Sequence, residues 1–235
     1  MENVKTLLAI CRVSNLPTVW MNVLSAAVLA QATPPPVAVA LLIIALSASY
    51  CGGMVLNDYF DRAYDAREQP FRPIPSGRIR EEQALWLAAG LLGLGIVLLV
   101  LAPNGMSVLP GAILLVAIVV YDRWHKSFPG SVFLMASTRT LVYVVTASAL
   151  VGSVATLVWI AAAASFFWTL SVTVVARSEA QRPGGFGFPV IPWMIAGMAT
   201  LDGVLLAVFV DPLWLVVGLG MTGLTRLGQR YVRGD

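Results

Sequence analysis

The amino-acid sequence predicts an all-α protein, a polytopic membrane bundle of about eight transmembrane helices. Of the 235 residues, 58% are hydrophobic and 11% are charged, against about 25% charged residues in an average soluble domain. The mean hydropathy is +0.83. Several apolar runs reach the roughly 20 residues that one spanning helix needs. These observations exclude a soluble globular domain, a disordered chain and an ordinary nucleic-acid-binding protein, and we expect a single domain over residues 1–235.

Apolar runs between polar breaks define the predicted spans. The run at 84–102 is the clearest, because it contains no charged residue. Three consecutive prolines at 34–36, and proline or glycine near 103, 152 and 212, mark turns between the other runs. The spans are expected near residues 16–31, 37–57, 84–102, 107–121, 131–152, 154–176, 189–210 and 212–227.

The basic residues lie on alternate connections. Lys5 and Arg12 precede the first span, and five arginines lie between the second and third. Apart from Arg139, inside span five, the remaining basic residues follow spans four, six and eight or lie at their ends. The positive-inside rule then places both termini and the long loops in the cytoplasm, with the inner membrane of the cell as the expected location. The first apolar segment is expected to be a retained helix. Polar chemistry is therefore expected at a mouth that faces the cytosol.

An acidic stripe is expected at the end of the second span. At about 100° per residue, Asn57, Asp61 and Asp65 share one helix face, and Asp58 lies beside it. Carboxylates on one face repel one another unless a cation neutralises them, and oxygen ligands without His or Cys favour Mg²⁺. The alternative is a solvated helix end whose acids pair with nearby arginines. The two cysteines lie far apart and indicate neither a disulfide framework nor a metal site.

The segment after this stripe adds basic groups. Two prolines and a glycine between Arg72 and Arg78 predict a stiff loop that returns both arginines to the mouth. The planar guanidinium group suits phosphate. Carboxylates for a metal beside arginines for phosphate indicate a diphosphate site.

At this point the sequence resembles the UbiA superfamily of intramembrane prenyltransferases. The family signature N-D-x-x-D-x-x-x-D is present from Asn57 to Asp65, and R-P-I-P-S-G follows at 72–77. The opening segment at 12–18, R-V-S-N-L-P-T, also looks like the entry to the family's first helix. The spacing of the spans agrees along nearly the whole chain.

The resemblance implies a helical bundle around a lipid-sized cavity and a Mg²⁺-dependent reaction. Carried over by position, Asn57, Asp58, Asp61 and Asp65 would hold the metal. Asp61 and Asp65 are also counted as catalytic, and Asn57 is also counted among the diphosphate-binding residues. An isoprenoid diphosphate would lose its diphosphate to give an allylic cation, which a hydrophobic or aromatic acceptor would attack. The implied surroundings are membrane lipid, and no nucleic acid is expected.

The family's second acidic motif is degenerate in this sequence. The connection after span six contains a single acid, Glu179, between Arg177 and Arg182, and position 183 is proline. Glu179 is predicted as a further metal ligand, and Arg182 as a diphosphate-binding residue. Local pairing of Glu179 with Arg182 at a helix end is the alternative.

Four further residues complete the prediction. Tyr121 and Lys126, at the end of span four, are expected to contact the diphosphate, or else to anchor the helix at the interface. Arg139 lies inside span five and is predicted to be catalytic, since a charge within the membrane is expensive. The alternative is that its side chain extends to the membrane interface. His125, the only histidine, is expected to be an exposed loop residue.

Three functions remain open at this point. The leading hypothesis is a prenyltransferase, which the intact first motif favours. The degenerate second motif and the short chain favour a UbiA-like protein that binds an isoprenoid or other lipid without transferring it. An intramembrane terpene cyclase, in which the isoprenoid's own double bond is the acceptor, is the third.

Overall fold

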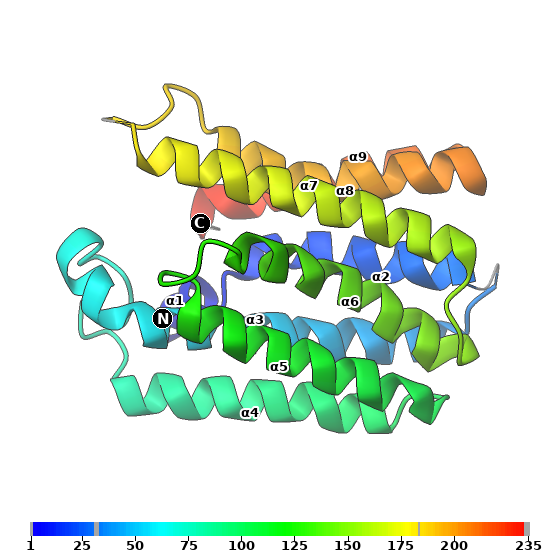
Figure 1. Cartoon of the computed structure of the whole chain (residues 1–235), viewed down its shortest axis with the longest axis horizontal. Coiled ribbons are helices and arrows are strands. Elements are labelled where there is room, and N and C mark those ends of the chain that lie inside the picture. Colours follow the sequence, from blue (N-terminus) through cyan, green and yellow to red (C-terminus); the bar gives the residue numbers. More distant parts are fainter. Residues whose placement is uncertain (1, 31–32, 183, 233–235) are drawn as a thin grey trace.

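The computed structural model describes residues 2–30, 33–182 and 184–232, and every regular element in these ranges is a helix (Figure 1). This confirms the predicted all-α class. In chain order the elements are α1 (Glu2–Ile10), η1 (Val13–Asn15), α2 (Leu16–Ala30), α3 (Pro36–Glu68), α4 (Glu81–Val100), η2 (Gly105–Ser107), α5 (Val108–Trp124), α6 (Ser131–Val151), α7 (Thr156–Ala180), α8 (Val190–Phe209) and α9 (Leu213–Tyr231).

Seven segments of the described chain are long and apolar enough to cross a membrane, by length and composition. They correspond to the first seven predicted spans. The eighth predicted span, 212–227, falls in α9, which is not among them. The second half of α9 carries Arg226, Gln229 and Arg230, and these polar side chains lower its hydropathy. The predicted count of eight spans is therefore not confirmed.

Helix α3 is longer than predicted. The sequence suggested a span at 37–57 followed by a polar connection from 58 to 83, but the helix continues to Glu68. No glycine or proline interrupts 54–69, and the helix ends just before Pro70, which cannot continue it. Its 33 residues make a helix about 50 Å long, against a hydrocarbon core of about 30 Å. The surplus length carries the acidic residues to one end of the bundle.

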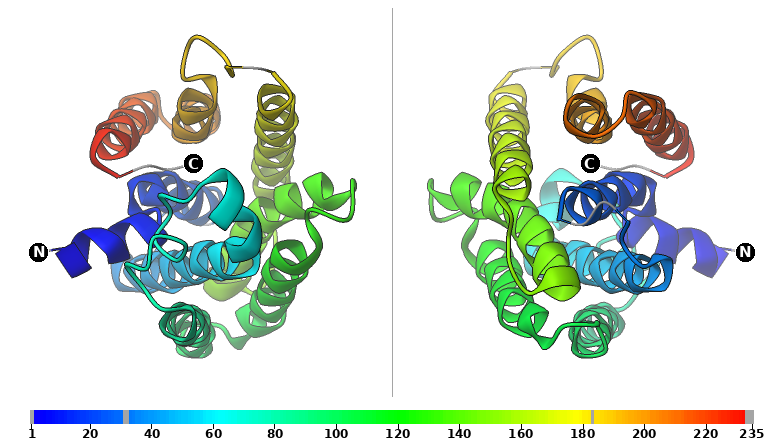
Figure 2. Two further views of the ribbon diagram at one scale, coloured as in Figure 1. Left: turned by 90° about the vertical axis from the view of Figure 1, so that its left-hand side faces the viewer. Right: turned by 90° about the vertical axis from the view of Figure 1, so that its right-hand side faces the viewer.

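The same side of the bundle also holds the first described helix, α1, and the C-terminal part of the last one, α9. In Figure 1 the α3–α4 connection, the N-terminal helix and the end of α9 lie on the left, and Figure 2 (left) looks onto this face. Gln229 Nε2 donates a hydrogen bond to Asn15 Oδ1 (3.0 Å), which ties α9 to the turn before α2. We call this the motif end of the bundle.

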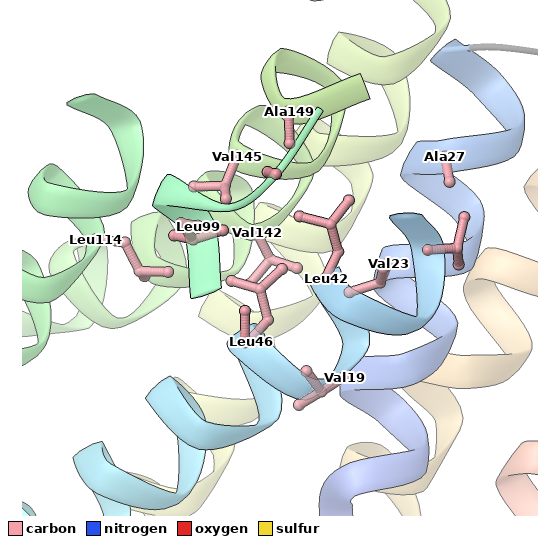
Figure 3. Close-up of a cluster of buried hydrophobic side chains, with 13 residues drawn as sticks. Val19, Val23, Ala27, Leu42, Leu46, Leu99, Leu114, Val142, Val145 and Ala149 are labelled. Atoms are coloured by element: carbon pink, nitrogen blue, oxygen red, sulfur yellow. The ribbon is translucent and has the colours of Figure 1, made fainter. Parts of the chain in front are cut away.

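The packed core runs along the bundle in several clusters, one of which lies at the motif end. Helix α2 is central, since it packs against α3, α6, α7, α8 and α9. One core cluster joins α2, α3, α5 and α6 through side chains such as Val23, Leu42, Leu114 and Val145 (Figure 3). The outward faces of α4, α5 and α7 expose large apolar side chains such as Trp86, Leu109 and Phe167. Apolar faces of this kind suit contact with lipid tails.

Candidate active site

The four polar residues of the first motif lie on the inner side of α3. Asp58, Asp61 and Asp65 are buried, and Asn57 is half-buried. The predicted stripe therefore faces the bundle and is not solvated, although two of its acids do pair with arginines, as the alternative expected. Buried carboxylates require a cation or several hydrogen-bond donors, so their surroundings determine what the site does.

Two arginines neutralise Asp58 and Asp65. Arg12 Nη2 lies 3.0 Å from Asp58 Oδ1. Arg72 Nη1 lies 2.9 Å from Asp65 Oδ2 and 3.4 Å from Asp58 Oδ1, so it bridges the two acids. The loop from Arg72 to Arg78 thus returns to α3 as the proline–glycine pattern predicted. Arg12, which the sequence did not single out as a site residue, adopts a left-handed backbone conformation between α1 and η1 (φ 45°).

Asp61 is neutralised from the other side by the α5–α6 connection. Lys126 Nζ lies 2.8 Å from Asp61 Oδ1, and His125 Nε2 lies 3.4 Å from Asp61 Oδ2. The expectation that His125 is an exposed loop residue is wrong, because its ring is half-buried between Asp61 and Tyr121. Tyr121 stacks on that ring, with centroids 5.0 Å apart.

A fourth carboxylate, Asp122, was missed by the sequence analysis as a site residue. It is buried on the last turn of α5, where its Oδ1 accepts a hydrogen bond from Asn57 Nδ2 (3.3 Å). Its Oδ2 is also buried and accepts no hydrogen bond from any residue that the structure describes. The only sequence signal was its place beside Tyr121 at a helix end.

The charged side chains at the end of α7 and in the α7–α8 connection contact residues close to them in the sequence. Glu179 Oε1 accepts a hydrogen bond from the Phe186 backbone N–H (3.1 Å), and the Arg182 guanidinium lies 4.9 Å from the Phe186 ring centre. Among the described contacts, none joins Glu179 or Arg182 to the acidic residues of α3. Their predicted roles in metal and diphosphate binding stay predictions.

Arg78 lies at the motif end but makes no ion pair in the described chain. Its Nη2 donates a hydrogen bond to the Phe71 carbonyl, and its Nε donates to Ser76 Oγ (2.9 Å). With Lys5, Arg12, Asp58 and Arg72 it lines a pocket of about 560 Å³, which we call the basic pocket. Arg72 and Arg78, two of the three arginines predicted to bind the diphosphate, are thus brought to one pocket.

An apolar cavity lies beneath the acidic face. Two adjoining cavities of about 70 and 160 Å³ share Tyr50, Met54, Tyr121, Met135 and Arg139 in their walls, and we call them together the inner cavity. One part reaches Asp122, and the other reaches Arg12 and Asn57. Its floor is the packed core, since Val19, Leu46 and Val142 belong to both.

Arg139 is the charged group deepest in this cavity wall. It is buried, with Nη1 donating to Asn22 Oδ1 (3.0 Å) and Nη2 to Thr18 Oγ1 (3.4 Å). Its guanidinium lies 5.7 Å from the Tyr50 ring centre, and Tyr50 precedes Asn57 by seven residues, which is about 10 Å along a helix. Arg139 therefore lies deeper than the acidic stripe.

Asp202 holds the partner of Arg139 in place. Asn22 Nδ2 donates to Asp202 Oδ2 (2.6 Å), and the Tyr143 hydroxyl donates to Asp202 Oδ1. All three side chains are buried. The network fixes the Asn22 amide and thereby the guanidinium of Arg139, so Asp202 acts here as a link between helices.

The donor set suits a hard divalent cation. Within the described residues, no three His, Cys, Asp or Glu side chains are gathered as a complete metal cage. However, Mg²⁺ typically takes one or two protein carboxylates, several waters and phosphate oxygens. Two buried carboxylate oxygens, Asp65 Oδ1 and Asp122 Oδ2, have no hydrogen-bond partner among the described residues. Asp65 and Asp122 therefore offer free carboxylate oxygens of the kind that this metal takes.

Fold and site together define a helical membrane protein with a charged mouth above an apolar cavity. The sequence model of the UbiA prenyltransferase family matches residues 16–228. The chain belongs to this family, as its motifs predicted, and is a multi-pass integral membrane protein.

Relatives agree with this assignment. The chain is 33% identical over 130 residues to digeranylgeranylglyceryl phosphate synthase of Natronomonas pharaonis, covering 55% of this chain and 47% of the relative. It is 31% identical over 185 residues to protoheme IX farnesyltransferase of Acidiphilium cryptum, covering 75% of this chain and 56% of the relative. The chain thus spans about half the length of these relatives.

A solved structure shows the same fold. A UbiA homologue from Archaeoglobus fulgidus bound to GPP and Mg²⁺ superposes with a TM-score of 0.64 at 15% identity, over 97% of each chain. At this identity the likeness concerns the fold.

Proposed function

We propose that this chain is a Mg²⁺-dependent intramembrane prenyltransferase that moves an isoprenyl group from an isoprenoid diphosphate to a hydrophobic or aromatic acceptor. The observation that carries the proposal is the arrangement on α3. Three buried carboxylates there each pair with an arginine or lysine side chain, and they lie above an apolar cavity. Membership of the UbiA family and the names of the relatives support it. The acceptor is proposed only as a chemical class.

The roles follow from position. Asn57, Asp58, Asp61 and Asp65 hold the metal, whose charge stabilises the departing diphosphate. Arg72, Arg78 and Lys126 bind the diphosphate oxygens, with Tyr121 beside them and Arg182 as the predicted contribution from the α7–α8 connection. If a metal were to neutralise Asp61 and Asp65, Arg72 and Lys126, which now pair with these acids, would be free to bind diphosphate oxygens.

The reaction is a substitution at the allylic carbon. The C–O bond to the diphosphate breaks, and its electron pair leaves with the diphosphate. The acceptor supplies the electron pair for the new bond and then loses a proton. The apolar walls of the inner cavity hold the isoprenyl chain and keep water from the cation. Arg139, in the same wall, is proposed to position the reacting groups within the cavity.

A second candidate function is binding or movement of an isoprenoid lipid without transfer. The observation that favours it is Glu179, the one acid of this region, which lies at the end of α7 and accepts a hydrogen bond from the Phe186 backbone N–H in the following connection. Cyclisation of the isoprenoid is the remaining alternative, since it needs the same ionisation but no separate acceptor.

Release of diphosphate is the measurement that separates these functions. The purified chain in detergent is given Mg²⁺ and allylic diphosphates of several lengths, first alone and then with a panel of aromatic and lipid acceptors. We expect release that Asp61→Asn abolishes, because the amide keeps the size of the side chain but not its charge. Asp211→Asn, the same change at the far end of the bundle, should release diphosphate normally.

Each outcome identifies one function. Release that requires an acceptor supports the transferase, and release without one supports the cyclase. Saturable isoprenoid binding without release would contradict the proposal and support the lipid-binding protein.

A further inference from the structure

We propose that Asp122 is an additional ligand of the divalent cation, acting with Asn57 and Asp61 from the facing helix. This inference rests on the proposed function but concerns metal binding by itself. The second group of acidic ligands is reduced to Glu179 at the end of α7. In this proposal, Asp122 at the end of α5 supplies a carboxylate in its place. The cation would then lie between α3 and α5.

The first observation is position. Asp122 lies opposite the start of the acidic stripe, and its Oδ1 is 3.3 Å from Asn57 Nδ2. It also lines the inner cavity together with Tyr121 and Arg139. A cation at this point would lie where the charged mouth meets the apolar cavity, which is where a diphosphate head group and its isoprenyl tail would join.

The second observation is an unpartnered oxygen. Asp122 is only 3% exposed, and its Oδ2 accepts no hydrogen bond from the described part of the chain. A buried ionised carboxylate is expensive unless a positive charge compensates it. A cation bound at this oxygen would supply the partner that it lacks.

The third observation is the contrast with the other acids. Asp58 and Asp65 have arginine partners, and Asp61 has a lysine and a histidine. Asp122 has no Lys, Arg or His within ion-pair distance in the described residues. The adjacent Arg123 lies over the Phe60 ring instead (5.4 Å). A bound cation would supply the missing positive charge.

The chemistry of the donors selects the class of cation. Two carboxylates and one amide provide only oxygen, which suits Mg²⁺ or Mn²⁺ rather than Zn²⁺ or copper. His125 is not required in this set, since its ring pairs with Asp61. Mn²⁺ can therefore replace Mg²⁺ as a spectroscopic probe.

Direct metal binding tests the proposal. The full chain in detergent is titrated with Mn²⁺, and free Mn²⁺ is followed by electron paramagnetic resonance, with and without inorganic diphosphate and without any isoprenoid. Asp122→Asn keeps an oxygen that can accept the Asn57 hydrogen bond but removes the charge. We expect it to weaken Mn²⁺ binding by roughly tenfold or more. Asp211→Asn, at the far end, should bind as the unmodified chain does.

A second readout guards against a folding defect. The melting temperature is measured in EDTA and in saturating Mg²⁺, because a ligand stabilises the state that binds it. Asp122→Asn should melt no lower than the unmodified chain in EDTA and should lose most of the Mg²⁺-induced rise. Loss of stability in EDTA with Mn²⁺ affinity unchanged would show a purely structural role and overturn the proposal.

Other outcomes are equally decisive. Equal Mn²⁺ affinity in Asp122→Asn and the unmodified chain, or no Mn²⁺ site in either condition, would overturn the inference. So would a loss caused by Glu179→Gln when Asp122→Asn has no effect. Failure of diphosphate release with Asp122-dependent Mn²⁺ binding intact would instead contradict the proposed function and leave the metal site standing.

Discussion

Each buried carboxylate of the α3 motif forms an ion pair with a basic side chain from another part of the chain. Among these basic side chains, Arg72 is expected to contribute most to stability, because one guanidinium nitrogen contacts both Asp58 and Asp65. Asp65 is almost fully buried, and its other oxygen already lacks a partner in the described chain. The metal-free fold therefore depends on a basic residue that the proposed reaction would also use.

Replacing Arg72 with alanine should destabilise the metal-free protein. Breaking a buried ion pair leaves an uncompensated charge, and for this partly exposed arginine we expect a loss of about 2 kcal/mol. Mg²⁺ should recover part of that loss, because it can neutralise the same carboxylates. The measurement is the melting temperature in detergent, in EDTA and in Mg²⁺.

Arg72→Lys is the matched control for this prediction. A lysine keeps the charge but lacks the planar fork, so it should lose less stability than alanine does. If Arg72→Ala melts at the temperature of the unmodified chain in EDTA, the bridge between Asp58 and Asp65 contributes nothing to the fold.

The helices were largely predictable as elements, because their boundaries follow local chemistry. Proline and glycine breaks gave most ends to within a few residues. The end of α3 was not found, because polar residues from 58 onward looked like a connection although nothing in that segment prevents a helix. Polar composition marks the end of the membrane, and only Pro70 marks the end of the helix.

At the element scale, α8 and α9 approach each other through two glycines. A Cβ added at Gly218 would lie 2.7 Å from the Ala199 carbonyl oxygen and 2.7 Å from Gly203 Cα. These are backbone atoms that cannot rotate away, so the two helices would have to separate. Close glycine contacts of this kind are common between membrane helices.

Gly218→Ala should therefore destabilise the α8–α9 pair, by about 1–3 kcal/mol. Gly220→Ala, two residues further along the same helix, meets nothing within 4 Å and should be neutral or slightly stabilising, since alanine favours helix. Melting temperatures of the two variants in one detergent measure the difference. Equal melting temperatures would mean that the two helices do not pack as closely as described.

At the scale of the whole molecule, the candidate site joins segments that are distant in the sequence. Helical periodicity was enough to place Asn57, Asp61 and Asp65 on one face. It did not predict that Arg12 would reach Asp58, or Asp122 reach Asn57, 65 residues away. Such contacts depend on which helices become neighbours and on their rotation, and neither can be read from one sequence.

The distribution of charge gives the molecule two unlike ends. The motif end carries the basic pocket and the α5–α6 connection with Lys126. The described part of the opposite end, with the α4–α5, α6–α7 and α8–α9 turns, has no lysine or arginine. Positive charge resists translocation, so we expect the motif end and both termini to face the cytosol.

Labelling from one side of the membrane tests this orientation. Met106 is exposed at the uncharged end and Ser76 at the motif end, whereas Cys11 and Cys51 are buried. In intact cells a membrane-impermeant maleimide should label Met106→Cys and leave Ser76→Cys unlabelled until the membrane is permeabilised. The unmodified chain, with its two buried cysteines, sets the background. Labelling of Ser76→Cys in intact cells would place the mouth outside and would require the isoprenoid diphosphate to be supplied from that side.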